Sequence, residues 1–223
     1  EELVKKKKQV EILGGGYYEP VLPMLSPADR SGQLEALTTL LRKKFGKRPR
    51  GCWITGSIWD NSLILPVKNS GMDYVFLDYE SLSPDSVRKR SCFKPFITED
   101  NGKLINIFPV HRMSGTSETV TIKNQIAELK EKVRNPEEVI SLIFSNTDIE
   151  NKSEEWVEKL FLELSSDREI RTINPPIYLK NPVRLEKIYV QNRSNYKNVL
   201  SDNYEINLLY ARMIHVQTLV NQI

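Results

Sequence analysis

The chain has 223 residues, of which 39% are hydrophobic and 27% are charged, as in an ordinary soluble globular protein. This length is sufficient for a substantial buried core, and the composition excludes the disordered and fibrous classes. The 32 basic and 29 acidic side chains give a net charge of +3, which is too balanced to indicate a nucleic-acid partner.

An amphipathic helix between apolar strands organises the amino-terminal third of the sequence. Ser26, Pro27 and Asp29 are a hydroxyl cap, a proline at the first helical position and an acid in the first turn. Leucines then recur at helical spacing until Gly46, so one face of this helix is expected to be buried. In chain order the predicted elements are a helix at 3–8, a strand at 10–13, the helix at 29–45, and strands at 52–55 and 74–77.

A β-hairpin interrupts this alternation, and further strands and helices follow it. Asn101-Gly102 is the turn pair of a two-residue hairpin loop between predicted strands at 93–97 and 103–108. Strands that alternate with helices are typical of a parallel sheet. The later predicted elements are a helix at 122–133, a fully apolar strand at 139–144, a helix at 156–164, a strand at 170–173 and a helix at 204–223.

Cysteine and histidine usage limits the chemistry that the chain is expected to perform. Cys52 and Cys92 lie in unrelated contexts and form neither a metal-ligand pattern nor a disulfide framework, so we predict a reducing, cytoplasmic location. His111 and His215 are the only histidines and lie on separate predicted elements, so no metal and no cofactor are predicted. No apolar run approaches the roughly 20 residues of a membrane span, so we expect no membrane partner.

Two segments carry a resemblance to a known family. Residues 11–20 read Glu-Ile-Leu-Gly-Gly-Gly-Tyr-Tyr-Glu-Pro, and residues 51–60 read Gly-Cys-Trp-Ile-Thr-Gly-Ser-Ile-Trp-Asp. With the strand at 74–79 and the hairpin at 98–109, they resemble in order the motifs of glycoside hydrolase family 57, whose members are α-amylases and 4-α-glucanotransferases. The resemblance implies an α/β fold: an incomplete or distorted (β/α)7-type TIM-like parallel barrel with an inserted β-hairpin and a C-terminal helix.

The resemblance also implies a division of the chain. Residues 1–200 would form the family 57-like barrel domain without its first strand, whose His-Gln-Pro motif would lie upstream of Glu1. Residues 201–223 would begin a C-terminal helical region. The family's Leu-Arg-Tyr-x-Ile-Pro-Phe segment is absent after the hairpin, and several sugar-binding loops are therefore expected to be shortened or lost.

The resemblance places the catalytic nucleophile of the family at Gly56. Retaining glycoside hydrolysis needs two carboxyl groups about 5 to 5.5 Å apart, one as nucleophile and one as acid and then base. The family reads approximately Gly-Leu-Trp-Leu-Ala-Glu-Arg-Val-Trp-Glu-Pro here, and this chain has Gly56 in place of the Glu and Ser57 in place of the Arg. The second carboxyl group falls at Asp148, a candidate general acid/base, although Asp148 would equally serve to cap a strand-to-helix turn.

Candidate substrate-binding residues follow from the same resemblance, because barrel chemistry gathers at the carboxyl ends of strands. Glu19 and Tyr18 come after the first predicted strand, and Asp78 ends a later one. Trp53 and Trp59 flank the vacant position, and exposed indole rings stack on glucosyl rings. The alternatives are structural: Glu19 bonds only its own turn, and either tryptophan belongs to the core.

Three functions stay open at this point. The first, which we favour, is a family 57-type domain that has lost catalysis and binds an α-glucan or maltooligosaccharide weakly, because losing the attacking group commonly costs about 10⁴- to 10⁶-fold in rate. The second is an active 4-α-glucanotransferase or α-amylase with a relocated carboxylate, for which Asp60 is one position. The third is a non-catalytic interaction module. The oligomeric state is left open.

Overall fold

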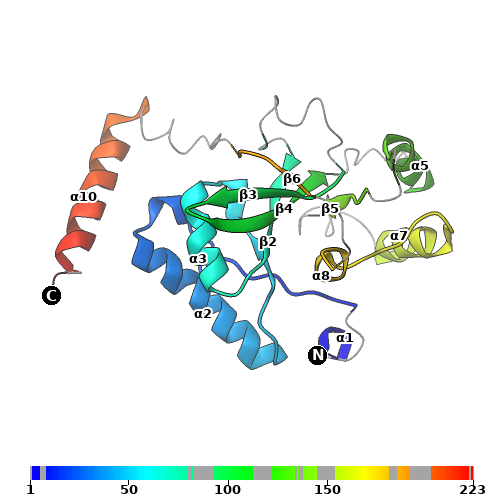
Figure 1. Ribbon diagram of the computed structural model, residues 1–223, viewed down its shortest axis with the longest axis horizontal. Helices are drawn as coiled ribbons and strands as arrows, with labels where there is room; N and C mark the ends of the chain where they lie inside the picture. Colours follow the sequence, from blue (N-terminus) through cyan, green and yellow to red (C-terminus); the bar gives the residue numbers. More distant parts are fainter. Residues whose placement is uncertain are drawn as a thin grey trace.

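A mostly parallel β-sheet forms the centre of the fold in the computed structural model (Figure 1). The structure describes residues 2–5, 9–79, 82, 93–112, 122–133, 135, 138–144, 154–180, 185–190, 202–220 and 222. The strands are β1 (Gly51–Trp53), β2 (Tyr74–Asp78), β3 (Phe96–Asp100), β4 (Lys103–Arg112), β5 (Ser141–Ile143) and β6 (Glu186–Lys187). The helices and 3-10 turns are α1 (Glu2–Lys5), η1 (Leu22–Met24), α2 (Pro27–Phe45), η2 (Thr55–Ser57), η3 (Asn61–Leu63), α3 (Ile64–Asn69), α5 (Ile122–Lys132), α7 (Glu154–Ser166), α8 (Pro175–Tyr178) and α10 (Tyr204–Val220).

The strand order explains how the sheet is built. β1, β2 and β4 lie side by side and run parallel, and β5 runs parallel to the last three residues of β4. β3 pairs with the first half of β4 as the antiparallel arm of the hairpin, and β6 pairs with β3. The mixed α/β fold with a mostly parallel sheet is as expected. The sheet is not closed among the described residues, so the predicted barrel is not confirmed.

Helix α2 begins and ends where the sequence predicts. The Ser26 hydroxyl oxygen accepts a hydrogen bond from the Asp29 N–H at 3.2 Å, which satisfies one of the free donors of the first turn. Gly46 adopts the left-handed conformation (φ 70°), and its N–H donates to the Arg42 carbonyl at 2.8 Å. The side chain of Leu34 is fully buried against the sheet-side core, as the leucine pattern predicts.

The hairpin is also confirmed, whereas two predicted strands are not. Asn101 and Gly102 both have positive φ (47° and 75°), as a two-residue hairpin turn requires. Residues 10–13 form no ladder, and only Gly14 makes an isolated parallel bridge to Cys52. The predicted strand at 170–173 is wrong: this segment pairs with no strand among the described residues, and it leads into the two prolines that open α8, which lack the N–H groups that a ladder needs.

Two hydrophobic clusters cover the opposite faces of the sheet, because successive strand residues point to opposite sides. One face, here called the helix-covered face, packs Cys52, Val75 and Leu77 against side chains of α2, η3 and α3. The other, here called the aromatic face, carries Tyr74, Phe76 and Phe108 together with Tyr178 of α8. The rings of Tyr74 and Phe108 meet edge to face with centroids 5.4 Å apart. A side chain's position along its strand therefore decides which face it occupies.

Asp73 fixes the amino-terminal edge of the sheet, where β1 and β2 begin. Its carboxylate accepts hydrogen bonds from the Arg50 guanidinium at 2.7 Å and the Lys68 ammonium at 2.8 Å. Partial burial raises the pKa of Asp73, but the hydrogen bonds and positive charges of Lys68 and Arg50 outweigh it and hold the pKa below the usual value. The ionised form is therefore favoured by folding.

We expect Asp73→Asn to lower the free energy of unfolding by about 1 kcal/mol at neutral pH, a small value because the carboxylate is 35% exposed. A carboxyl group with a depressed pKa in the folded state stabilises the fold above its unfolded pKa of about 3.9, and this stabilisation is lost as the pH falls through the folded pKa. Urea unfolding from pH 7 to pH 2.5 should thus show a shallower acid loss in the variant. An acid loss equal to that of the unsubstituted chain would contradict the assignment; Glu128→Gln, which removes an exposed pair on α5, is the control.

Candidate functional site

The turn that follows β1 holds the position where a nucleophile was expected. Gly56 is exposed and adopts the left-handed conformation (φ 61°, ψ 13°) at the centre of η2. The turn is closed by the Ser57 N–H, which donates to the Ile54 carbonyl at 2.9 Å, and by the Ile58 N–H, which donates to the Thr55 carbonyl at 3.2 Å. At its apex the turn therefore presents backbone and no carboxylate.

Ser57 connects this turn to the next strand. Its side chain is 5% exposed, and its hydroxyl oxygen accepts a hydrogen bond from the Asp78 N–H at 2.9 Å. Ser57 also has a positive φ of 53°, which is uncommon for a residue with a β-carbon. The carboxyl ends of β1 and β2 are thus joined by a side chain beyond the last paired residues of their ladder, Trp53 and Phe76.

The strand register places two of the predicted sugar contacts on the same face. Trp53 lies opposite Phe76, and both are half-buried. Asp78 follows Phe76 by two residues, so its side chain leaves the strand on the same, aromatic face. Tyr79 lies on the helix-covered face, where its ring stacks on that of His111 with centroids 5.1 Å apart. Trp53 and Asp78 therefore share a face from which His111 is absent.

The turn at residues 17–19 lies at the same edge of the sheet. It follows the Gly14 bridge to Cys52, so the chain runs parallel to β1 toward its carboxyl end. Tyr18 is 79% exposed, and its ring meets that of Tyr17 edge to face at 4.8 Å. Glu19 is exposed and has a positive φ of 49°; its own N–H donates to the Gly16 carbonyl at 3.1 Å. Both predicted contacts are open to solvent.

Trp59 lies in the hydrophobic core and has no exposed face for stacking. Its side chain is 2% exposed, and its indole N–H donates to the Asn61 side-chain oxygen at 3.0 Å. The expectation of a sugar platform at Trp59 therefore gives way to its structural alternative. The Trp59 ring is buried because it belongs to the same hydrophobic cluster as Leu63 of η3 and Ile64 of α3, which follow it in the chain.

The remaining carboxylates of the expected site are either engaged or outside the described residues. Asp60 accepts a hydrogen bond from the Ser62 N–H at 3.0 Å and thereby caps η3. Asp148, the candidate general acid/base, lies outside the described residues, so the structure does not place it relative to Gly56.

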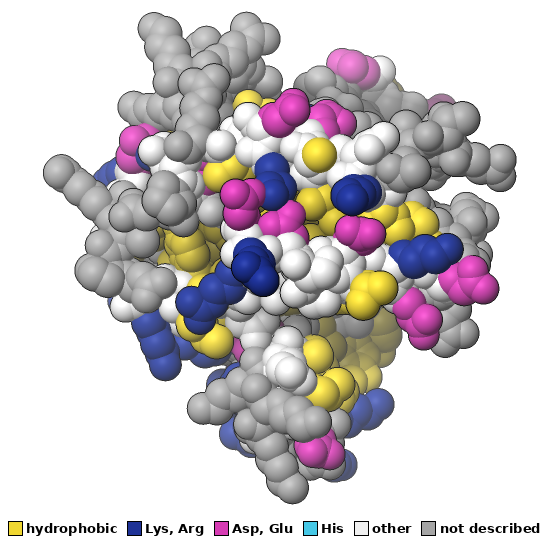
Figure 2. Space-filling view, turned by 90° about the vertical axis from the view of Figure 1, so that its right-hand side faces the viewer, with side chains coloured by type: hydrophobic (Ala, Val, Ile, Leu, Met, Phe, Trp, Pro, Cys, Tyr) yellow, Lys and Arg dark blue, Asp and Glu magenta, His cyan; other side chains and the backbone are white. Residues whose placement is uncertain are grey.

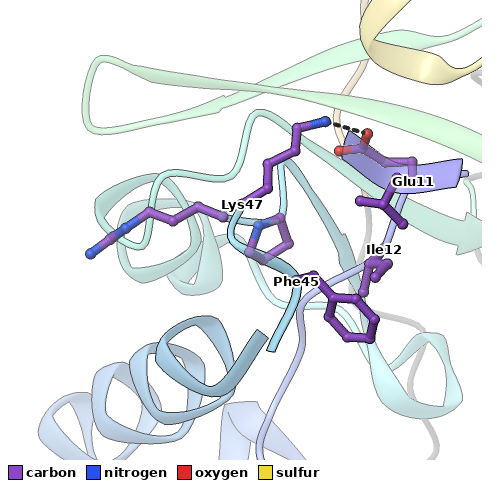
Figure 3. Close-up of a pocket in the computed structure, with 7 residues that line it drawn as sticks. Glu11, Ile12, Phe45 and Lys47 are labelled. Atoms are coloured by element: carbon purple, nitrogen blue, oxygen red, sulfur yellow. Dashed lines mark hydrogen bonds and ion pairs between the residues drawn. The ribbon is translucent and has the colours of Figure 1, made fainter. Parts of the chain in front are cut away.

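A small hollow lies at the opposite end of the sheet from Gly56. It is lined by Ile12 and Phe45, among others, and the Lys47 ammonium forms an ion pair with the Glu11 carboxylate at 3.2 Å across it (Figure 3). These residues precede the Gly14 bridge and β1, so they mark the amino-terminal edge of the sheet. The hollow is separate from the edge of the sheet that carries Gly56 and the turn at residues 17–19, and it has room for about one water molecule.

Within the part of the chain that the structure describes, no three His, Cys, Asp or Glu side chains gather closely enough to hold a metal ion. No helix in that part is both long and apolar enough to cross a membrane. On the face that carries α5 and α7, basic and acidic side chains are interspersed with hydrophobic ones (Figure 2).

Two residues near the carboxyl end of β1, Ser57 and Gln33, were not predicted from the sequence to belong to the site. Gln33 of α2 binds the turn at residues 17–19: its side-chain oxygen accepts a hydrogen bond from the Tyr18 N–H at 3.0 Å, and its carbonyl accepts one from the Tyr17 N–H at 3.2 Å. Nothing in the spacing of Gln33 indicates this contact. Ser57 had a weak signal, because a Gly-Ser pair directly after an apolar strand is typical of a tight turn.

Comparisons with known proteins agree with this architecture. The profile of glycosyl hydrolase family 57 matches residues 1–175. A 4-α-glucanotransferase of Thermococcus kodakarensis and an α-amylase of Pyrococcus furiosus are each 36% identical over 105 residues, which is 47% of this chain and only 16% of each relative. The structure of the 4-α-glucanotransferase from Thermococcus litoralis superposes with a TM-score of 0.70 at 25% identity, over 86% of this chain and 31% of that one.

A second solved structure supports the fold alone. The family 57-type branching enzyme of Pyrococcus horikoshii has a TM-score of 0.69 at 17% identity, over 86% of this chain and 48% of that chain. The profile match extends over well more than half of the sequence and includes both the turn at 17–19 and the turn that contains Gly56. The chain belongs to glycosyl hydrolase family 57.

Proposed function

We propose that this chain is an α-glucan-binding domain of the family 57 type that does not catalyse glycosyl transfer. The single observation that carries the proposal is Gly56, which occupies the turn after β1 in a left-handed conformation and offers no carboxylate. Without an attacking oxygen at this point, no glycosyl-enzyme ester forms there. The match to glucanotransferases and amylases supports an α-glucan such as starch, glycogen or a maltooligosaccharide as the ligand.

The side chains next to Gly56 do not supply the missing nucleophile. The Ser57 hydroxyl is buried and accepts a hydrogen bond from the Asp78 backbone, and the Asp60 carboxylate caps η3. Trp53 and Asp78 on the aromatic face, with Tyr18 and Glu19 on the neighbouring turn, remain as sugar contacts. An indole face and carboxylates are the groups that stack on glucose rings and accept bonds from their hydroxyls.

A second candidate is an active transferase or amylase in which Asp78 is the relocated nucleophile. One observation favours it: the Asp78 backbone is bonded directly to the turn where the family nucleophile is expected. A retaining reaction would still need a second carboxyl group about 5 to 5.5 Å away. The purely structural interaction module remains as the outcome in which no sugar is bound.

Incubation with maltoheptaose separates these functions. We expect no redistribution into shorter and longer oligomers, and heat of binding in calorimetry at millimolar sugar. Redistribution that is abolished by Asp78→Asn would replace the proposal with the second candidate. The absence of binding heat at millimolar maltoheptaose would leave only the interaction module.

Restoring the carboxylate tests whether the vacant position is correctly placed. A β-carbon at Gly56 would lie 3.5 Å from the nearest atoms, those of Ile58, which is an ordinary contact distance, but the left-handed φ costs about 1 to 2 kcal/mol. We expect Gly56→Glu to fold with that loss of stability and to redistribute maltoheptaose detectably. Gly56→Gln carries the same strain without a nucleophile and should stay inactive. Equal behaviour of the two variants would contradict the placement of the nucleophile.

We propose further that residues 1–200 form the glucan-binding domain, that residues 201–223 begin a helical region, and that the protein is cytoplasmic. The division is supported by α10, which stands apart from the sheet in Figure 1. Its contacts include the Tyr210 hydroxyl with the Met24 carbonyl and Gln217 with Asp29, both at 3.1 Å. Many of its large apolar side chains are exposed, among them Leu209 and Val220. The location rests on cysteine usage alone.

A further inference from the structure

We propose that Ser57 is a positioning residue that sets the place of Asp78 for contact with the glucan. The inference rests on the proposed binding function and adds a residue to it. Ser57 does not touch the sugar, because its side chain is buried. It acts through the hydrogen bond that its hydroxyl oxygen accepts from the Asp78 N–H.

The strand register shows why this bond is needed. The ladder between β1 and β2 ends at Trp53 and Phe76, so beyond that point no residue of β1 pairs with β2. On its other side β2 remains paired with β4 as far as Asp78 and Val110. The Ser57 hydroxyl therefore supplies the contact on the side of β1 that the ladder no longer provides. Together with the pairing to β4, this bond holds the last residue of β2 from both sides.

The backbone at Ser57 supports a specific role for its hydroxyl. A left-handed conformation costs a residue with a β-carbon roughly 1 to 2 kcal/mol, and glycine would avoid this cost. Gly56, directly before it, also has a positive φ and is a glycine. A serine at the second position keeps the strain and gains one group, the hydroxyl that binds Asp78. Strained residues of this kind gather at functional sites.

Two substitutions at Ser57 separate the bond from the strain. Ser57→Ala removes the bond and keeps the strain, whereas Ser57→Gly removes both. We expect both variants to bind maltoheptaose about tenfold more weakly in calorimetry, in proportion to one lost hydrogen bond. Their melting temperatures should differ, with the glycine variant the more stable. A purely structural role would instead make binding follow the melting temperature.

The double substitution Ser57→Gly with Asp78→Asn identifies the residue through which Ser57 acts. If Ser57 works through the Asp78 carboxylate, removal of Ser57 should cost no further affinity once Asp78 is Asn. Unchanged binding by Ser57→Ala and Ser57→Gly, or a full additional loss of affinity in the double variant compared with Asp78→Asn, would overturn the inference while the proposed function stands. No binding by the unsubstituted chain would overturn both.

Discussion

Gly51→Ala is expected to lower the free energy of unfolding by about 3 kcal/mol or to prevent folding. A β-carbon at Gly51 would lie 2.2 Å from Cε2 and 2.4 Å from Cζ of Tyr74, the residue opposite it in the neighbouring strand. The Tyr74 ring is fully buried and packs edge to face on Phe76 and Phe108, so any shift of the ring would disturb these contacts. Urea denaturation followed by tryptophan fluorescence measures the loss.

Gly32→Ala is the matched control for this substitution. Gly32 lies on the exposed side of α2, and an added β-carbon there would have no atom within 4 Å. Alanine is the better helix former, so this variant should be about 0.5 to 1 kcal/mol more stable than the unsubstituted chain. An unfolding free energy for Gly51→Ala close to that of Gly32→Ala would contradict the close packing of the Tyr74 ring against Gly51.

Trp59→Ala should destabilise the fold by about 3 to 5 kcal/mol. The substitution leaves a cavity in the cluster that joins η3, α3 and the helix-covered face, and it leaves Asn61 without the indole N–H. Trp59→Phe should recover most of the packing and lose mainly the hydrogen bond, at about 1 kcal/mol. Thermal unfolding of both variants measures the difference.

Trp53→Ala provides the contrast that a sugar platform requires. Trp53 is half-buried on the aromatic face, so its loss should cost about 1 kcal/mol of stability. We expect this variant to lose maltoheptaose binding, while Trp59→Phe keeps it. The opposite pattern, with binding lost only in the Trp59→Phe variant, would return the stacking role to Trp59.

Local signals in the sequence were sufficient for several elements. Ser26 and Gly46 mark the ends of α2 because capping depends on residues only a few positions away. Asn101-Gly102 likewise specifies its turn through the positive φ of both residues. The resemblance to family 57 came from short motifs of the same local kind, and the family profile confirms it.

Features that depend on distant contacts were not predictable in the same way. Whether residues 170–173 pair as a strand depends on a neighbouring strand, which this segment lacks among the described residues. The burial of Trp59 depends on how η3 and α3 fold back, whereas its sequence position beside Gly56 indicated a sugar contact. The bond between Ser57 and Asp78 joins residues 21 positions apart and left no trace in either local pattern.

The hairpin tip gives this molecule a practical handle. Lys103 begins β4 three residues before Asn106, which lies opposite Tyr74 at the start of β2, so the tip projects from the amino-terminal edge of the sheet. The turn that contains Gly56 lies at the other edge. Because Asn101 and Gly102 are exposed, a fluorophore or surface-attachment tag inserted between them would leave the glucan-facing loops unobstructed for immobilised binding assays.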